Sequence, residues 1–143
     1  MKALEIPTFT FPRNEWNNPD EILDLLNRLD IDLIVLTGFL CMIQPSIIEA
    51  YAGRIINIHP SLLPKYGGTG MWGHHVHEAV IAAQETESGI TIHHVTNEVD
   101  GGEIIFQASC KVIKGDTPST LAQRVHELEH THYPKVIEQL LLN

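Results

Sequence analysis

The sequence predicts an α/β fold with a mostly parallel sheet whose last two strands form an antiparallel hairpin. Apolar, strand-like runs alternate with helical segments, as they do in α/β proteins. The run over residues 32–37 is continuously apolar, which is typical of a strand buried on both faces. Two β-rich segments, 89–96 and 103–113, flank a short loop containing Asp-Gly-Gly, a pattern that predicts a hairpin.

Local signals predict the remaining elements in chain order. Asn18 and Pro19 form a helix start, with the asparagine as N-cap and the proline in the first helical position. Ile22 and Leu26 lie on the apolar stripe of that helix. No repeat or linker interrupts the 143 residues, so we expect one domain over 1–143. We expect a strand over 6–11, helices over 18–29 and 45–51, a strand over 54–59, and helices over 73–84 and 117–142.

Composition narrows the classes of function before any motif is considered. The chain is 43% hydrophobic and 19% charged, as ordinary globular proteins are. No segment is long enough for a membrane-spanning helix, and the first residues lack a signal-peptide pattern, so we expect no membrane partner. Both cysteines lie in apolar segments, which indicates buried thiols in a reducing cytoplasm. The net charge of −9 argues against nucleic acid, because phosphate backbones need clustered Lys and Arg.

The most informative motif begins inside a predicted strand. Asn57 and His59 are two residues apart, so alternation points both side chains to one side. Pro60 ends the strand and places His59 at its carboxyl edge, where open α/β sheets bind ligands. Asp100 stands before the two glycines of the hairpin loop. An amide, an imidazole and a carboxylate are the parts needed to carry an acyl group through a charged tetrahedral intermediate.

Two other motifs resemble well-known sites but fit them poorly. Residues 126–130 read H-E-x-x-H, which on a helix could bind Zn²⁺. The sole good third ligand after it is His132, and Pro134 constrains the helix there, so we disfavour a zinc site. Residues 68–73 read G-x-G-x-x-G, but a dinucleotide fingerprint must directly follow a strand. We interpret that segment as a glycine-rich active-site loop, and we expect no metal.

The motif Asn-x-His-Pro-Ser-Leu-Leu-Pro over 57–64, with the later Asp-Gly-Gly, resembles the folate-dependent formyltransferase family. Residues 65–68, 73–79 and 124–130 resemble its purine branch. The resemblance implies a formyltransferase-like three-layer sandwich, of which 1–143 would be the C-terminal two-thirds of the catalytic domain. It also implies transfer of a formyl group from the cosubstrate 10-formyltetrahydrofolate to the amine of 5'-phosphoribosylglycinamide, in de novo purine biosynthesis and without a metal.

The resemblance also implies roles for particular residues. Asn57 and the charged form of His59 would donate hydrogen bonds to the developing alkoxide, while Asp100 would favour the imidazolium and relay the amine's proton through water. The family's glycine-rich phosphate turn has no counterpart in the sequence, so we expect an N-terminally truncated chain with a weakened substrate clamp. The folate would contact Arg13, Leu40, Cys41, Met42, Ile43, Thr96, Asn97, Glu98 and Val99, and the ribonucleotide would contact His126, Glu127, Leu128 and Glu129.

Several alternatives share these motifs. Formyltetrahydrofolate hydrolases and sugar-amine formyltransferases carry the same three residues, and a non-catalytic folate-binding fragment would keep the site without turnover. Methionyl-tRNA formyltransferases add a basic tRNA-binding domain, to which this acidic sequence does not correspond. We therefore expect small-molecule partners, and the sequence leaves self-association into a homo-oligomer open.

Overall fold

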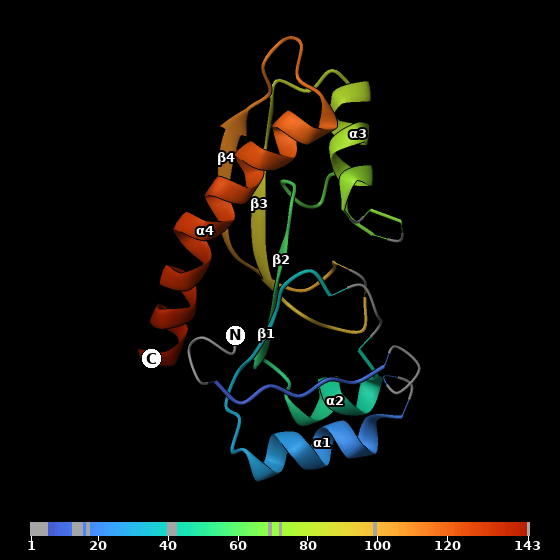
Figure 1. Cartoon of the computed structure of the whole chain (residues 1–143), viewed down its shortest axis with the longest axis vertical. Coiled ribbons are helices and arrows are strands. Elements are labelled where there is room, and N and C mark those ends of the chain that lie inside the picture. The colour runs from blue at the N-terminus through green and yellow to red at the C-terminus, as the bar shows by residue number, and fades with distance from the viewer. Residues whose placement is uncertain are drawn as a thin grey trace.

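The computed structural model describes residues 6–12, 16, 18–39, 43–68, 70–71, 73–98 and 100–142. Strands and helices alternate along these residues until the last two strands follow each other (Figure 1). The elements are α1 (Pro19–Arg28), β1 (Ile34–Leu36), α2 (Pro45–Ala50), β2 (Ile55–His59), α3 (His74–Ala82), β3 (Glu87–His94), β4 (Ile104–Lys111) and α4 (Pro118–Leu142).

The sheet has the order β1-β2-β3-β4 and is mixed, so the prediction of a mostly parallel sheet is wrong. Only β1 and β2 pair in parallel among the described strands, while β2 with β3 and β3 with β4 are antiparallel. The reason lies in the connection after β2, where α3 continues away from the end of the strand instead of running back along it (Figure 1). Strand β3 therefore returns in the opposite direction. The antiparallel hairpin of β3 and β4 was predicted and is confirmed.

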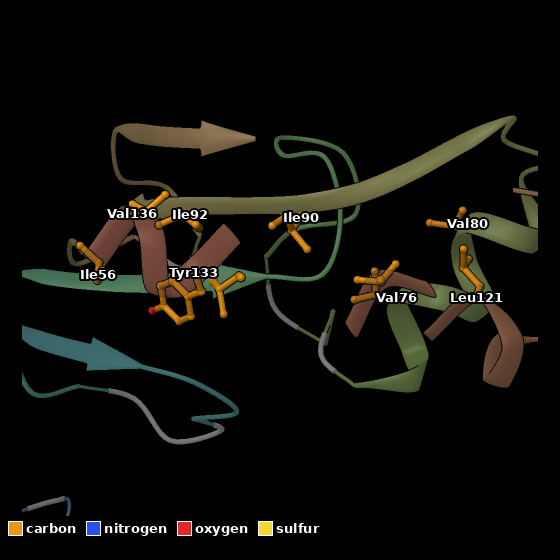
Figure 2. Packing of buried hydrophobic residues seen from close by; sticks show 10 residues of the cluster. Ile56, Val76, Val80, Ile90, Ile92, Leu121, Tyr133 and Val136 are labelled. Carbon is orange, nitrogen blue, oxygen red and sulfur yellow. The ribbon is translucent and has the colours of Figure 1, made fainter. Parts of the chain in front are cut away.

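Helices pack against both faces of the sheet. Side chains alternate along β2, so neighbouring residues of this strand enter two different buried clusters. Ile56 and Ile58 belong to the larger buried cluster, which also contains residues of α3 and α4 such as Val80 and Leu121 (Figure 2). Ile55 points the other way and packs with Ile22 of α1 and with α2. Asn57 and His59 share the parity of Ile55. Their side chains therefore belong to the α2 face of the sheet.

The N-terminal part of the described chain departs from two predictions. Residues 6–12 form no strand, and Ile6 and Phe9 are exposed, because no described strand pairs with this β-rich segment. Strand β1 is only three residues long and half-buried throughout, whereas a strand buried on both faces was predicted. Among the described strands it pairs with β2 alone, so no described strand lies along its other edge.

Helices α1 and α4 follow their predicted limits closely. Pro19 begins α1 and Asp20 and Glu21 occupy its first turn, where acidic groups interact favourably with the helix dipole. Asn18 is at the N-cap, but its side chain makes no capping hydrogen bond. Helix α4 continues through Pro134. Within the described part of the chain, none of the helices combines the length and apolarity that crossing a membrane requires.

Candidate active site

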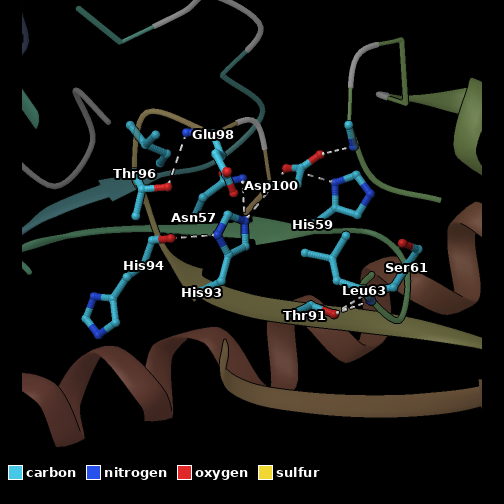
Figure 3. Close-up of polar contacts among 12 residues, drawn as sticks. Asn57, His59, Ser61, Leu63, Thr91, His93, His94, Thr96, Glu98 and Asp100 are labelled. Atoms are coloured by element: carbon cyan, nitrogen blue, oxygen red, sulfur yellow. Dashed lines mark hydrogen bonds and ion pairs between the residues drawn. The ribbon is translucent and has the colours of Figure 1, made fainter. Parts of the chain in front are cut away.

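The end of β2 and the hairpin loop bring the three predicted catalytic residues into one polar cluster (Figure 3). His59 is almost completely buried, with 4% of its surface exposed. Its Nδ1 lies 3.5 Å from Oδ1 of Asp100, and its Nε2 lies 2.7 Å from the carbonyl oxygen of Tyr66. Because a carbonyl oxygen can only accept a hydrogen bond, Nε2 of His59 carries a proton and donates a hydrogen bond to the carbonyl oxygen of Tyr66. The imidazole is thus fixed between a loop carbonyl and the carboxylate.

Asp100 is held by the backbone as well as by histidines. Its Oδ2 accepts a hydrogen bond of 2.8 Å from the N–H of Gly68, in the loop that precedes α3. Its own φ is 54°, in the left-handed region that Asp tolerates better than most side chains. The backbone of Gly68 therefore helps to hold the carboxylate that was predicted to be catalytic.

His93 is a fourth member of the cluster that the sequence analysis did not assign to the site. Its Nδ1 lies 2.9 Å from the carbonyl oxygen of His94, so Nδ1 is the protonated nitrogen. Its Nε2 lies 3.3 Å from Nδ2 of Asn57 and 3.8 Å from Oδ1 of Asp100. Burial lowers the pKa of His93, against the opposing effects of the His94 carbonyl and Asp100, and so favours a neutral ring. A neutral Nε2 accepts from the Asn57 amide, which fixes the orientation of that amide.

Strand register explains why His93 reaches the site. Asn57 and His93 are directly opposite each other in the antiparallel pairing of β2 with β3, and opposite residues share a face of the sheet. A β-bulge between Ile92 and His93 shifts the pairing with β4 at the same point. Bulges next to functional sites often redirect a side chain in this way. The signal in the sequence was the alternation of β3, which puts His93 and His94 on opposite faces.

The turn after β2 is held by a buried hydroxyl network. The Oγ of Ser61 donates to the carbonyl of Lys65 at 2.9 Å, and Ser61 is fully buried. Thr91 donates to the carbonyl of Ser61 at 2.7 Å and accepts from the N–H of Leu63 at 3.0 Å. Gln107 adds a bond to the carbonyl of Leu63. Ser61 therefore anchors the turn and is not presented as a nucleophile.

A cavity of about 400 Å³ opens beside the polar cluster. Apolar atoms form most of the surface of its wall, and the polar side chains of Asn57, His93 and Asp100 are part of its lining. Of the residues predicted to contact folate, Ile43, Thr96, Asn97 and Glu98 line it, whereas Arg13, Leu40, Cys41, Met42 and Val99 lie outside the described residues. The rest of the lining is Leu36, Phe39, Gln44, Pro45, Ile48 and Val95.

The residues predicted to contact the ribonucleotide lie on α4 and are not among those that line this cavity. His126 and Glu127 are exposed, whereas Leu128 packs against the larger buried cluster. His126 forms an ion pair with Glu129 across 3.3 Å. The H-E-x-x-H motif therefore has its first histidine paired within α4.

Fold and site together define an α/β protein with an amide, two imidazoles and a carboxylate gathered beside an apolar cavity, a constellation suited to acyl transfer. The chain belongs to the formyl transferase family, whose sequence model matches residues 1–137. The resemblance inferred from the motifs is thereby confirmed.

Individual relatives agree with this membership. The chain is 39% identical to phosphoribosylglycinamide formyltransferase of Bacillus subtilis, over 98% of this chain and 71% of that protein. It is 40% identical to the chloroplastic phosphoribosylglycinamide formyltransferase of Arabidopsis thaliana, over 92% of this chain but only 47% of that protein. The crystal structure of phosphoribosylglycinamide formyltransferase from Brucella melitensis superposes with a TM-score of 0.87 and 38% identity, over 97% of this chain and 71% of that one. The chain thus spans about half to seven-tenths of these relatives.

Proposed function

We propose that this chain transfers a formyl group from 10-formyltetrahydrofolate to the amine of 5'-phosphoribosylglycinamide. The observation that carries the proposal is the convergence of Asn57, His93 and Asp100 on one part of an apolar cavity. Cavities of this kind, with a few convergent polar groups, are the usual sites for small organic ligands. The apolar wall would hold the flat rings of the folate, and the polar residues would lie at its formyl group.

Asn57 is the residue best placed to stabilise the transition state. Attack of the amine on the formyl carbon gives a tetrahedral alkoxide, and N10 then leaves with the electron pair of the broken bond. One N–H of the Asn57 amide is directed to His93, which leaves the other N–H for the alkoxide. Because His93 fixes the amide before the substrate arrives, this donor needs no reorganisation during the reaction.

Asp100 would accept the proton that the attacking amine loses, through one bound water, and the same proton would pass to N10 as the C–N bond breaks, so that neutral tetrahydrofolate leaves. His59 lies behind Asp100, with its Nε2 engaged by the carbonyl of Tyr66. It would donate to the alkoxide only after exchanging that bond, so its first role in this geometry is to hold and polarise the carboxylate. The exposed side chains of His126 and Glu127 remain candidates for contact with the ribonucleotide.

We also propose that this chain works in a reducing compartment. Cys110 is a free, half-buried thiol, which suits a reducing compartment such as the cytoplasm.

The test is the deformylation of 10-formyltetrahydrofolate followed by absorbance, with and without glycinamide ribonucleotide. Amine-dependent turnover supports the transferase, whereas amine-independent turnover indicates a hydrolase. Folate binding without any turnover indicates a binding module, and turnover with amino sugars indicates a sugar-amine enzyme.

A pair of matched variants tests the site itself. Asn57→Ala should lower the turnover by about 10²–10³, as loss of one such donor usually does, while folate affinity changes little. Asn18→Ala makes the same chemical change at an exposed position whose side chain forms no capping bond, and it should leave turnover unchanged. Equal rates for the two variants would contradict the role given to Asn57.

A further inference from the structure

We propose that His74, His75 and Glu78 on the first turns of α3 form a surface site for a divalent transition-metal ion such as Zn²⁺ or Ni²⁺. Each residue offers one ligand atom, and the three atoms lie within 4.8 Å of one another. Nε2 of His74 is 3.6 Å from Oε1 of Glu78, and the two histidine rings are 4.4 Å apart between centroids. Nothing in the formyl-transfer proposal uses these side chains.

Helix geometry explains how the three ligand atoms meet. His74 and Glu78 are four residues apart, so they lie one turn from each other on the same side of α3. Around a tetrahedral ion, ligand atoms with Zn–N distances of 2.0–2.1 Å are about 3.3 Å from one another. The His74–Glu78 separation of 3.6 Å is already close to this value. Small rotations of exposed side chains, which cost little, would close the remaining distance to His75.

The ligand set selects the class of metal. Two imidazoles and one carboxylate suit borderline ions such as Zn²⁺, Ni²⁺ and Cu²⁺, whereas Ca²⁺ and Mg²⁺ prefer oxygen ligands alone. Because all three side chains are exposed, the remaining coordination positions would be filled by water. The helix dipole opposes a cation at the N-terminal end of α3. The negative charge of Glu78 is therefore needed to offset it, and the net charge of −9 acts in the same direction.

The site is distinct from the zinc motif that the sequence presents on α4. The three ligands are not among the residues that line the 400 Å³ cavity. His126 of the H-E-x-x-H motif is paired with Glu129, and in the described part of the chain His126 and His130 are not part of a group of three converging ligands, as the α3 residues are. We therefore place the metal ion on α3, although the known metal-binding motif in the sequence lies on α4.

Isothermal titration of the metal-free chain with ZnCl₂, and separately with NiCl₂, tests the proposal. We expect one ion per chain, and we expect His74→Ala and Glu78→Gln each to weaken binding at least about tenfold, which is about 1.4 kcal/mol. Glu78→Gln keeps the shape of the side chain, so it reports the ligand and its charge without a change in packing. His130→Ala is the matched control, because it removes an exposed histidine from the other motif and should leave the affinity unchanged.

Two results would overturn the proposal. One is the absence of saturable binding of either ion to a chain that circular dichroism shows to be folded. The other is a loss of affinity in His130→Ala with none in His74→Ala, which would assign the ion to α4. Because all the substituted side chains are exposed, we expect each variant to fold, and a circular dichroism spectrum recorded for each variant verifies this.

Discussion

Substituting Gly102 by alanine should separate the residues proposed to be catalytic without removing any of them. A Cβ atom added at Gly102 would lie 1.7 Å from the carbonyl oxygen of His94, whereas real Cβ atoms essentially never come closer than 3.0 Å to such an atom. The difference requires a displacement of about 1.3 Å. The obstacle is backbone on β3, so the loop that carries Asp100 must move. The same His94 carbonyl accepts the hydrogen bond from His93, so the anchor of that ring is disturbed as well.

The expected magnitude follows from these distances. A shift of about 1.3 Å that carried Asp100 away from Gly68 would break their hydrogen bond of 2.8 Å. Overpacking of this kind typically destabilises a protein by about 1–3 kcal/mol. A 1 Å misplacement of catalytic groups can lower a rate by about 10²-fold. We therefore expect Gly102→Ala to lower both the free energy of unfolding and any formyl-transfer rate.

Urea unfolding followed by circular dichroism measures the first effect, and the absorbance assay measures the second. The control is Gly101→Ala in the same loop. Its Cβ would meet side-chain atoms of Glu98 at 2.6 Å, and Glu98 is exposed and able to move. We expect that variant to lose less than about 1 kcal/mol. If Gly102→Ala is as stable and as active as Gly101→Ala, the close approach of the loop to β3 is not a constraint, and the reasoning fails.

Three further predictions concern the stability of the fold. Leu121→Ala, at a fully buried position, should lower the free energy of unfolding by about 2–5 kcal/mol in urea, against about 0.5 kcal/mol or less for the exposed Leu141→Ala. The hydrogen bonds from Arg124 hold the pKa of Asp116 well below its ordinary 3.8, so the ionised carboxylate stabilises the fold, and this stability is lost as the pH falls below about 4. In thermal melts, Arg124→Met should therefore lose less stability than the parent chain as the pH is lowered through this range. Burial lowers the pKa of His77 below 6.5, so its protonation favours the unfolded chain as the pH falls through that value, and His77→Gln should lose less stability than the parent between about pH 7 and pH 5.

The parts of the site that the sequence predicted are those set by local chain geometry. Asn57 and His59 share a face because they are two apart on one strand, and the proline after them ends that strand. The Asp-Gly-Gly turn had to lie in the loop of a hairpin, and Asp100 reaches His59 from there. These are short-range relations that alternation and turn chemistry determine, so one sequence was enough to predict them.

The parts that the sequence did not predict depend on direction and register between distant segments. Strand β3 was taken to continue a parallel sheet, because nothing local records which way α3 leaves the end of β2. The position of His93 opposite Asn57 depends on a pairing across 36 residues and on a bulge with β4. The β-rich segment 6–12 has the composition of a strand, but composition cannot supply a neighbouring strand to pair with.

The local sequence motif and the long-range strand register both determine the role of Asn57, and each explains a different N–H of its amide. The local motif explains why an amide stands at the strand end, where it can reach a ligand. The long-range register explains what orients the Asn57 amide. The buried, neutral His93 accepts a hydrogen bond from one N–H of that amide, and the second N–H is left for a ligand. An amide fixed on one side only by solvent would rotate and lose its donor geometry as charge developed. The antiparallel return of β3, the feature that sequence reasoning predicted wrongly, is thus the feature that gives the predicted catalytic amide its orientation.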